Sequence, residues 1–547
     1  MTRFAPVLLA TLCVAVLFTG LDRVGWLDTR EARDAQVARE MLRRREALTP
    51  IYGHAALFEK PVLAYAPEVV VRTLAGDSPQ RSRQLRALFA VFLLLGIASI
   101  GARHFGLRAG WLAAVVLVTS VGLPLAARAD GTQVLGTLLG WVGAAGLADV
   151  VFGRSAGRDA RLIVTYGVLG ITLATIGPLA ALWPLGGLAL YLGLTRSRGA
   201  WRRARPLAGL AIMAGLSLPW YGAMLERHGL PFLARLPFFP YAIEPAGAWY
   251  AGPVVATRAL VEGCFPWIAL LPAAMLHAGT WWRARRGPLP GAPAPSERPG
   301  SDPNAREQRE EGMAHYLIAC VFAALVPVAI FKSPPLTAAL PALPAAALLC
   351  GRFLDHLFEQ PARLARPLGG AVRMLALAGT VAALGLPLVT AAVRDARPGV
   401  RVLEALLLAT SWAPFLAHWM GRTRLAASLI ALPVALGAPV ASLVVVPALE
   451  DTLSARRVAE SLAEVAPERA PLLLVDPAPP TLRFYGSHNL VVADSLAPAL
   501  PRLRAADGMT YLAFTPAREP GVARAAAAPL EILLRTPSLV LARVRAG

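Results

Sequence analysis

The sequence predicts an all-α polytopic membrane protein with about 13 transmembrane helices and a small α/β domain at its C-terminal end. Apolar residues make up 56% of the 547-residue chain and charged residues only 16%, whereas soluble globular proteins are roughly half apolar and a quarter charged. Apolar segments of about 20 residues recur along most of the chain, each long enough to cross a bilayer. Since lipid offers the backbone no hydrogen-bond partners, these segments are expected to be helices.

Short breaks rich in arginine or proline separate the expected spans. At Gly177-Pro178 the chain forms either a tight hairpin between two spans or a kink within one longer helix. The first apolar run lacks an A-x-A-like cleavage site, so we expect a retained helix rather than a cleaved signal peptide. The spans lie near residues 4–20, 85–102, 108–127, 132–152, 161–176, 178–195, 206–224, 264–280, 313–331, 335–351, 371–393, 402–419 and 424–448.

The basic residues predict which side of the membrane each loop faces. The net charge is +20, but no long basic run or aromatic-basic platform indicates a nucleic acid partner. Arginines cluster in alternate short loops, which the positive-inside rule assigns to the cytoplasm together with the N-terminus. Segment 283–312, rich in Pro, Gly and charge, lies there as a flexible loop. The arginines of the loops assigned to the cytoplasm are Arg154, Arg158, Arg161, Arg196, Arg198, Arg202, Arg203, Arg205, Arg283, Arg285, Arg286, Arg352, Arg363, Arg366, Arg422 and Arg424.

The longer segments on the other side are expected to carry the function. They are a first outward loop at 21–84, a second at 225–263, and residues 450–547, which follow a membrane domain of residues 1–449. The C-terminal segment contains the strand-like runs PLLLVD, NLVVAD, MTYLAF and SLVLARV and a helical stretch at 453–465. We therefore predict a small soluble α/β domain outside the cytoplasm.

The first outward loop places many charges on the side where arginine is normally depleted. A helix over 29–45 would lie along the membrane surface and direct several charges at one cavity. The alternative is an amphipathic interfacial helix whose arginines reach lipid headgroups. The chain contains only two lysines, Lys60 and Lys332, and both are expected on the outward side beside proline-containing turns. A compact ammonium at these points suits a phosphate oxygen.

A motif in this loop resembles that of a known enzyme family. The residues are Glu31, Arg33, Arg39-Glu40-Met41, Pro50 and Phe58-Glu59-Lys60-Pro61. They resemble the GT-C type polyprenyl-phosphate-dependent glycosyltransferases, especially the lipid A aminoarabinose transferases and their protein-mannosyltransferase-like relatives. Weaker similarity extends over most of residues 20–350.

The resemblance implies a membrane glycosyltransferase. Such enzymes move a sugar from a polyprenyl-phosphate donor, such as undecaprenyl phosphate, to lipid A, a glycan or a protein. They act on the outer face of the bacterial cytoplasmic membrane, so membrane lipids are partners as well. No nucleotide takes part, in agreement with the absence of a phosphate-binding Gly-rich motif.

The resemblance also implies roles for individual residues. A carboxylate takes or orients the acceptor proton, and cations stabilise the departing lipid phosphate. Glu31 is the expected general base and Asp28 the second candidate. The alternative is that Asp28 caps the helix and Glu31 is a surface residue paired with arginines. The expected ligands of the donor phosphate are Arg33, Lys60, Arg39 and Lys332.

The chain departs from the family pattern at several positions. Arg30 stands where the family has the first of two acids, and Ile176 stands where it has a lysine before Gly-Pro. In the aminoarabinose branch the glutamate matching Glu59 joins a histidine at a metal, but this chain has Ala242 to Pro245 where that histidine is expected.

No cofactor is therefore certain, and a divalent metal stays an open alternative. Its ligands would be Glu59 with Glu244 or His54. His228 is interpreted as an ordinary loop residue. Asp130, at the start of a span, is either a functional acid or an N-cap. The four cysteines lack metal-ligand spacing and imply no disulfide framework.

Two other function classes fit the same spans. A lipid or solute transporter would also have an intramembrane charged site, but it predicts inverted repeats, which the sequence does not reveal. A noncatalytic membrane scaffold derived from the same family would explain the missing acid, lysine and histidine.

Overall fold

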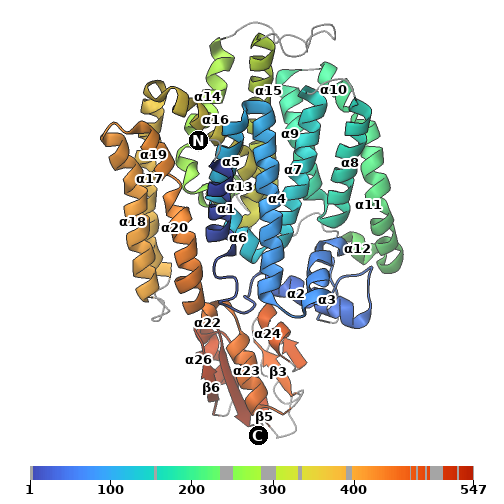
Figure 1. Cartoon of the computed structure of the whole chain (residues 1–547). Helices are drawn as coiled ribbons and strands as arrows, with labels where there is room; N and C mark the ends of the chain where they lie inside the picture. Colours follow the sequence, from blue (N-terminus) through green and yellow to red (C-terminus); the bar gives the residue numbers. More distant parts are fainter. Residues whose placement is uncertain are drawn as a thin grey trace.

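The computed structural model combines a large helical body with a smaller α/β unit at the C-terminal end of the chain (Figure 1). It describes residues 4–53, 55–152, 157–196, 198–234, 250–284, 303–330, 336–389, 397–467, 470–475, 478–486, 489–492, 509–526 and 529–545. The prediction of a mainly helical, polytopic chain with a C-terminal α/β segment agrees with this architecture.

Nine helices in the described part of the chain are long and apolar enough to cross a membrane, or up to 11 if each of two bent pairs is one span. The predicted number of about 13 is therefore not confirmed. The first apolar helix, Ala5–Phe18, is short. The helical body consists of α1 (Ala5–Cys13), η1 (Val14–Phe18), α4 (Pro79–Phe105), α5 (Leu107–Val118), α6 (Gly122–Ala129), α7 (Gly131–Phe152), α8 (Arg158–Thr175), α9 (Pro178–Thr195), α10 (Arg198–Ala204), α11 (Pro206–His228), α12 (Leu230–Ala234), α13 (Ala251–Cys264), η3 (Trp267–Ala269), α14 (Leu271–Ala284), α15 (Pro303–Ile330), η4 (Leu336–Ala342), α16 (Leu343–Glu359), α17 (Pro361–Val389), α18 (Arg397–Trp419), α19 (Thr423–Leu429), α20 (Leu432–Val440), η6 (Ala441–Val445) and α21 (Val446–Ala448).

Three predicted segments differ in detail from the helices observed. The span expected near 108–127 is the pair α5 and α6, bent by 56°. The span expected near 264–280 starts earlier, as α13, and bends by 116° before α14. The flexible loop expected over 283–312 ends earlier, because α15 begins at Pro303 in a stretch of good helix formers, Ala, Arg, Glu and Gln. Residues 285–302 lie outside the described part.

The break at Gly177-Pro178 separates two helices. Gly177 has φ 114°, a value that favours glycine, and Pro178 opens α9, where its missing amide proton costs no helical hydrogen bond. Of the two alternatives for this break, the structure has the connection between separate helices.

Small residues allow the central helices to approach closely. A Cβ atom added at Gly101 of α4 would lie 2.5 Å from the Cα of Gly110 on α5, and one at Gly351 of α16 would lie 2.7 Å from the carbonyl oxygen of Ala109. Close backbone contact through small residues is the usual way in which membrane helices pack. α16 is the most buried of the candidate spans and forms the centre of the body.

The first outward loop folds into short elements at one end of this body. These are α2 (Arg30–Arg44), β1 (Ile51–Tyr52), β2 (Ala55–Ala56), η2 (Val62–Tyr65) and α3 (Ala66–Ala75). The predicted helix over 29–45 is confirmed. Its N-cap is Thr29, whose hydroxyl accepts a hydrogen bond from the amide of Glu31, so the alternative in which Asp28 caps the helix is wrong.

The C-terminal unit is a five-stranded mixed sheet with helices. The strand order is β4-β3-β5-β7-β6, with β3 parallel to β4 and β5, and β7 antiparallel to β5 and β6. The four predicted runs match β3, β4, β5 and β7, whereas β6 has no counterpart among them. The unit consists of α22 (Glu450–Leu453), α23 (Arg456–Val465), β3 (Pro471–Leu474), α24 (Pro480–Tyr485), β4 (Asn489–Val492), β5 (Met509–Phe514), η8 (Pro516–Arg518), α26 (Glu519–Ala526), β6 (Glu531–Arg535) and β7 (Val540–Arg545).

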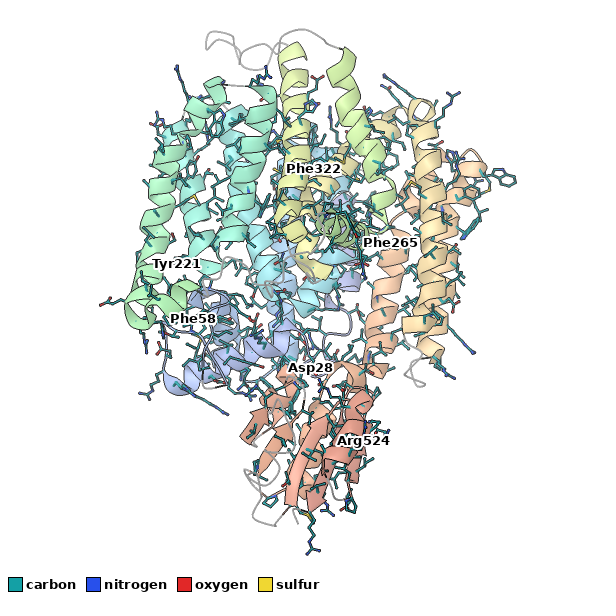
Figure 2. All side chains as sticks on the ribbon, turned by 180° about the vertical axis from the view of Figure 1, so that it is seen from behind. Asp28, Phe58, Tyr221, Phe265, Phe322 and Arg524 are labelled. Atoms are coloured by element: carbon teal, nitrogen blue, oxygen red, sulfur yellow. The ribbon has the colours of Figure 1, made fainter. Side chains whose placement is uncertain are left out.

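The first loop and the C-terminal unit lie at the same end of the helical body. Figure 1 shows α2 and α3 beside α24 at this end, while α10 and the facing ends of α14 and α15 lie at the opposite end. The two segments that the sequence singles out, although far apart in the chain, therefore meet in space. Figure 2 places Asp28 at their junction.

Candidate functional site

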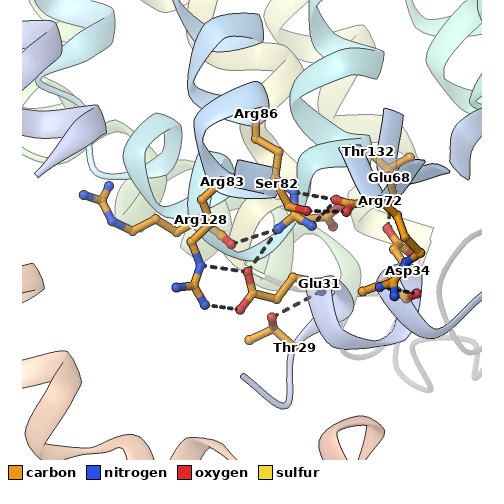
Figure 3. A network of polar contacts seen from close by, with 12 residues as sticks. Thr29, Glu31, Asp34, Glu68, Arg72, Ser82, Arg83, Arg86, Arg128 and Thr132 are labelled. Carbon is orange, nitrogen blue, oxygen red and sulfur yellow. Dashed lines mark hydrogen bonds and ion pairs between the residues drawn. The ribbon is translucent and has the colours of Figure 1, made fainter. Parts of the chain in front are cut away.

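Glu31, in the first turn of α2, is the centre of a buried polar network (Figure 3). Its side chain is almost completely buried, and both carboxylate oxygens accept hydrogen bonds from Arg83 of α4, at 2.6 and 3.1 Å. Arg86, one turn further along α4, donates to Oε2 at 3.0 Å, and the amide of Leu27 donates to Oε1 at 3.0 Å. Bidentate contact with an arginine fixes a carboxylate in one orientation.

The network continues from the two arginines into the rest of the loop. Arg83 also donates to the carbonyl oxygens of Leu21, Val24 and Gly25 at 2.6 to 3.0 Å, which ties the chain before α2 to α4. Arg86 pairs with Glu68 of α3. The network therefore fastens both helices of the first loop to a membrane span.

A glycine at the start of α7 makes room for this network. A Cβ atom at Gly131 would lie 2.6 Å from Cγ and 2.8 Å from Nε of Arg86. The Arg86 side chain thus passes directly against the N-terminus of α7, and no larger residue fits there without displacing it.

A second buried cluster, which the sequence does not reveal, lies one helical turn beyond Glu31. Lys60 donates to both oxygens of Asp34 at 2.7 and 2.8 Å and to the hydroxyl of Thr132 at 3.0 Å. The Thr132 hydroxyl also lies 3.0 Å from Asp34 Oδ2. Lys60 is only 4% exposed and Asp34 only 6%. The cluster joins α2, the turn before η2, and the first turn of α7.

Tyr65 borders this cluster and has an unused hydroxyl. Its side chain is fully buried, and Lys60 Nζ lies 5.2 Å from the ring centroid. Among the described residues its hydroxyl has no hydrogen-bond partner. Burial, and to a smaller degree the charge of Asp34, raises the pKa of this hydroxyl well above its usual range. Buried polar groups are normally paired, so the hydroxyl of Tyr65 is available to a ligand.

Asp130 lies next to Thr132 and serves as a helix cap. Its Oδ1 accepts a hydrogen bond from the amide of Gln133 at 3.1 Å, which is the contact of an N-cap. Its Oδ2 lies 3.3 Å from Nη1 of Arg30. Arg30, which replaces the first acid of the family motif, therefore places a positive charge at the start of α7.

The sequence-predicted phosphate ligands occupy different surroundings. Arg33 pairs with Glu59 at 2.6 Å, and both side chains are about one-third exposed. Arg39 instead faces the C-terminal unit: it donates to the carbonyl oxygen of Phe484 at 2.6 Å and stacks on the Phe484 ring. Only Lys60 and Arg33 thus remain near the centre of the loop. Lys332 lies outside the described residues.

Asp28 also binds the C-terminal unit rather than the centre of the site. Its Oδ1 accepts hydrogen bonds from the amide and the hydroxyl of Thr481 at 2.8 and 2.5 Å. Burial raises the pKa of this carboxyl, and the two hydrogen bonds from Thr481 oppose the shift. At the same junction, the Trp26 amide donates a hydrogen bond of 2.8 Å to the hydroxyl of Tyr485.

No metal-binding group is apparent in the described part of the chain, where no three His, Cys, Asp or Glu side chains lie together. Glu59, the predicted ligand, is engaged with Arg33. Its predicted partners Glu244 and His54 lie outside the described residues. The function proposed below is therefore argued without a metal.

The second outward loop packs against the first through aromatic residues. Phe58 lies edge-on to His228 and to Phe232, with ring centroids 5.1 and 5.4 Å apart. His228 Nε2 lies 2.9 Å from the hydroxyl of Thr49. His228 is the last residue of α11, so its interpretation as a loop residue is not met, and its contacts join α11 to the first loop. Figure 2 shows Phe58 at this end of the molecule.

A small cavity of about 60 Å³ in the helical body is lined by Gln133 and Gly136 of α7 and by Ile176 and Gly177. Ile176, which replaces the lysine expected from the family, thus contributes an apolar wall. A larger groove of about 410 Å³ runs along α4, α7 and α8 and contains none of the candidate residues.

Comparison with known proteins supports the resemblance seen in the first loop. No family model matches the chain. It is 26% identical over 422 residues to the undecaprenyl phosphate-α-4-amino-4-deoxy-L-arabinose arabinosyl transferase of Pectobacterium carotovorum, across 72% of this chain and 67% of that protein. The enzyme of the same name from Shewanella sediminis is 26% identical over 46% of this chain and 47% of its own length.

The fold agrees with these sequence similarities. The crystal structure of ArnT from Cupriavidus metallidurans bound to undecaprenyl phosphate superposes with a TM-score of 0.73 at 19% identity, over 98% of this chain and 97% of that one. The resemblance predicted from the first-loop motif is therefore confirmed, and the chain has the fold of the GT-C type aminoarabinose transferases.

Proposed function

We propose that this protein is a membrane glycosyltransferase that moves a sugar from a polyprenyl-phosphate donor to an acceptor in the bacterial envelope. The observation that carries the proposal is the match of almost the whole chain to a fold whose solved example binds undecaprenyl phosphate. The polar site of the first loop lies at the end of the helical body that also carries the C-terminal unit.

In this proposal Lys60 binds the donor phosphate. An ammonium stabilises the negative charge that collects on a departing phosphate, and a buried one does so strongly because little water screens it. The N-terminus of α7, at Thr132, adds the positive end of a helix dipole at the same place. Arg33, which is partly exposed, would meet the sugar or acceptor side of the donor.

The acceptor proton needs a carboxylate, and the sequence favours Glu31. In the structure Glu31 is surrounded by the two arginines of α4, an arrangement suited to positioning α2. The family motif predicts Glu31 as this base, and Asp34, one helical turn further along α2, is a second carboxylate beside Lys60. Substitutions at these two acids separate their roles.

The orientation proposed is an N-terminus in the cytoplasm and a C-terminal unit outside it. The separation of the arginine-rich helix α10 from the first loop along the helical body supports this orientation. The site would then work on the outer face of the cytoplasmic membrane. Aminoarabinose is the first candidate sugar, because the relatives from Pectobacterium and Shewanella are named as aminoarabinose transferases. Lipid A is the first candidate acceptor, as the resemblance of the first-loop motif implies.

The experiment compares cells with and without the protein by mass spectrometry of lipid A, envelope glycans and exported proteins. The proposal expects one of these to gain the mass of a sugar only when the protein is present, and aminoarabinose on lipid A would identify both substrates. Unchanged spectra in cells whose membranes contain the full-length protein would favour the noncatalytic scaffold instead.

A further inference from the structure

We infer that Asp34 is the general base of the proposed transfer, and that it is released for this task when the donor phosphate takes Lys60 from it. This inference rests on the proposed function. It assigns a catalytic role to a carboxylate outside the family motif, at the centre of the buried cluster formed with Lys60 and Thr132.

Asp28, just before α2, and Glu31 and Asp34, in its first turns, have different hydrogen-bond partners. Asp28 is bound by Thr481 of the C-terminal unit, and Glu31 is bound on both oxygens by Arg83 with Arg86 beside it. A guanidinium stays protonated at any working pH, so the contacts of Glu31 persist during a reaction. Asp34 alone among the three is held mainly by the residue that the donor phosphate needs.

Lys60 cannot keep all its hydrogen bonds to Asp34 and Thr132 and also donate to a phosphate. Its ammonium has three hydrogens, and in the structure it donates to both oxygens of Asp34 and to Thr132. A donor phosphate that approaches Lys60 adds negative charge within a few ångströms of Asp34. A nearby like charge disfavours the ionised carboxylate and so raises its affinity for a proton. Arrival of the donor therefore turns Asp34 from a counter-ion into a base.

The surroundings are prepared for a ligand. The hydroxyl of fully buried Tyr65, beside Lys60, has no hydrogen-bond partner among the described residues. A phosphate at Lys60 would give the Tyr65 hydroxyl an acceptor. In the structure Lys60, Asp34 and Thr132 hydrogen-bond to one another. The Tyr65 hydroxyl beside them can donate a further hydrogen bond to a phosphate.

The proposed step conserves protons and electrons. The acceptor hydroxyl gives its proton to a carboxylate oxygen of Asp34, and the acceptor oxygen forms a bond to the anomeric carbon of the sugar. The bond between that carbon and the phosphate oxygen breaks, and its electron pair stays on the polyprenyl phosphate. Lys60 holds the resulting charge.

The test measures undecaprenyl phosphate binding and sugar transfer for the full-length protein in lipid nanodiscs. Asp34→Asn is expected to bind undecaprenyl phosphate about tenfold more tightly, the scale of one like charge removed. Its transfer rate is expected to fall about 10²- to 10⁴-fold, the usual contribution of a general base. Asp159→Asn is the matched control, because this aspartate is 71% exposed and pairs with Arg205, at a distance of 3.0 Å, away from the first loop.

A second comparison keeps the inference testable if Asp34→Asn, which leaves Lys60 without its counter-ion, fails to fold. Lys60→Gln alone leaves Asp34 unpaired, whereas Lys60→Gln with Asp34→Asn leaves a neutral pair. If Asp34 is the base, the double variant transfers sugar more slowly than Lys60→Gln. If Asp34 only neutralises Lys60, the double variant recovers activity, and the inference is overturned.

The outcomes separate this inference from the proposed function. Weaker or unchanged binding of undecaprenyl phosphate by folded Asp34→Asn, or a wild-type transfer rate in it, overturns the role of Asp34 while the glycosyltransferase stands. A wild-type protein that binds undecaprenyl phosphate but transfers no sugar overturns the proposed function itself.

Discussion

Arg83 Nη2 lies 2.6 Å from Glu31 Oε1 in a pair whose side chains are both buried, although the two residues are 52 positions apart in the chain. The pair joins the first-loop helix α2 to the span α4, and neighbouring contacts of Arg83 fix the backbone before α2. The position of every candidate residue on α2 therefore depends on this ion pair, which makes it the first target for mutation.

Glu31→Gln should destabilise the protein by about 3–5 kcal/mol, because it leaves Arg83 and Arg86 buried without their main counter-charge. The midpoint of thermal unfolding in detergent measures this effect. Glu404→Gln serves as a control, since it changes a glutamate of α18 far from the first loop. A Glu31→Gln variant with wild-type stability and no transfer would instead support the sequence-based assignment of Glu31 as the base.

Lys60→Ala should reduce sugar transfer by about 10²–10³-fold, the usual cost of removing one group that stabilises transition-state charge. Lys60→Arg should not restore it, since the site is only 4% exposed and a planar guanidinium does not replace a compact ammonium there. Both variants should also bind undecaprenyl phosphate more weakly. The exposed Arg422, which precedes α19, provides the control variant Arg422→Ala. Equal binding by Lys60→Ala and wild type would remove Lys60 from the phosphate site.

Asp28→Ala should loosen the C-terminal unit, because the amide and hydroxyl of Thr481 lose their common acceptor. A buried donor left unpaired costs about 1–3 kcal/mol. Hydrogen exchange should accelerate in α24 first. Asp28→Asn retains an acceptor oxygen and should behave like wild type, partly because burial already raises the pKa of Asp28 and disfavours its charge. Unchanged exchange in Asp28→Ala would show that other contacts hold the junction.

Glu46 provides a test by pH. Its hydrogen bond with Arg227, followed by one from the amide of Leu48, lowers the pKa of its carboxyl from 4.5 to about 2. A lowered folded-state pKa stabilises the protein above the unfolded value, and that stabilisation disappears as pH falls from about 4.5 towards 2. The difference in thermal midpoint between wild type and Glu46→Gln should therefore shrink between pH 6 and pH 3. A difference that stays constant over this range would contradict the ion pair with Arg227.

The sequence predicts the helical body well because the membrane imposes a length and a composition on each span. It also locates the first loop and the strands β3, β4, β5 and β7. It misses β6, whose run EILLR is short and ends in a charge, and it extends the flexible loop over the start of α15. Such boundaries depend on tertiary contacts that local patterns do not contain.

The candidate site is harder to predict in detail. The motif locates Glu31 and Lys60, but neither Arg83 nor Arg86 stands out, because both lie at the edge of a predicted span, where arginines commonly mark a membrane boundary. Asp34 does not belong to the motif, so the resemblance does not single it out. A signal is nevertheless present: Asp34 lies three positions after Glu31, which places both acids on nearly the same face of α2.

The central claim is that this chain transfers a sugar from a polyprenyl-phosphate donor. The most direct measurement incubates the purified full-length protein in nanodiscs with undecaprenyl-phosphate aminoarabinose and lipid A, and follows both products by mass spectrometry. We expect lipid A to gain aminoarabinose while undecaprenyl phosphate is released in equal amount, and Lys60→Ala to form both products about 10²–10³-fold more slowly. Release of neither product by folded wild-type protein, with this donor and with other undecaprenyl-phosphate sugars, would contradict it.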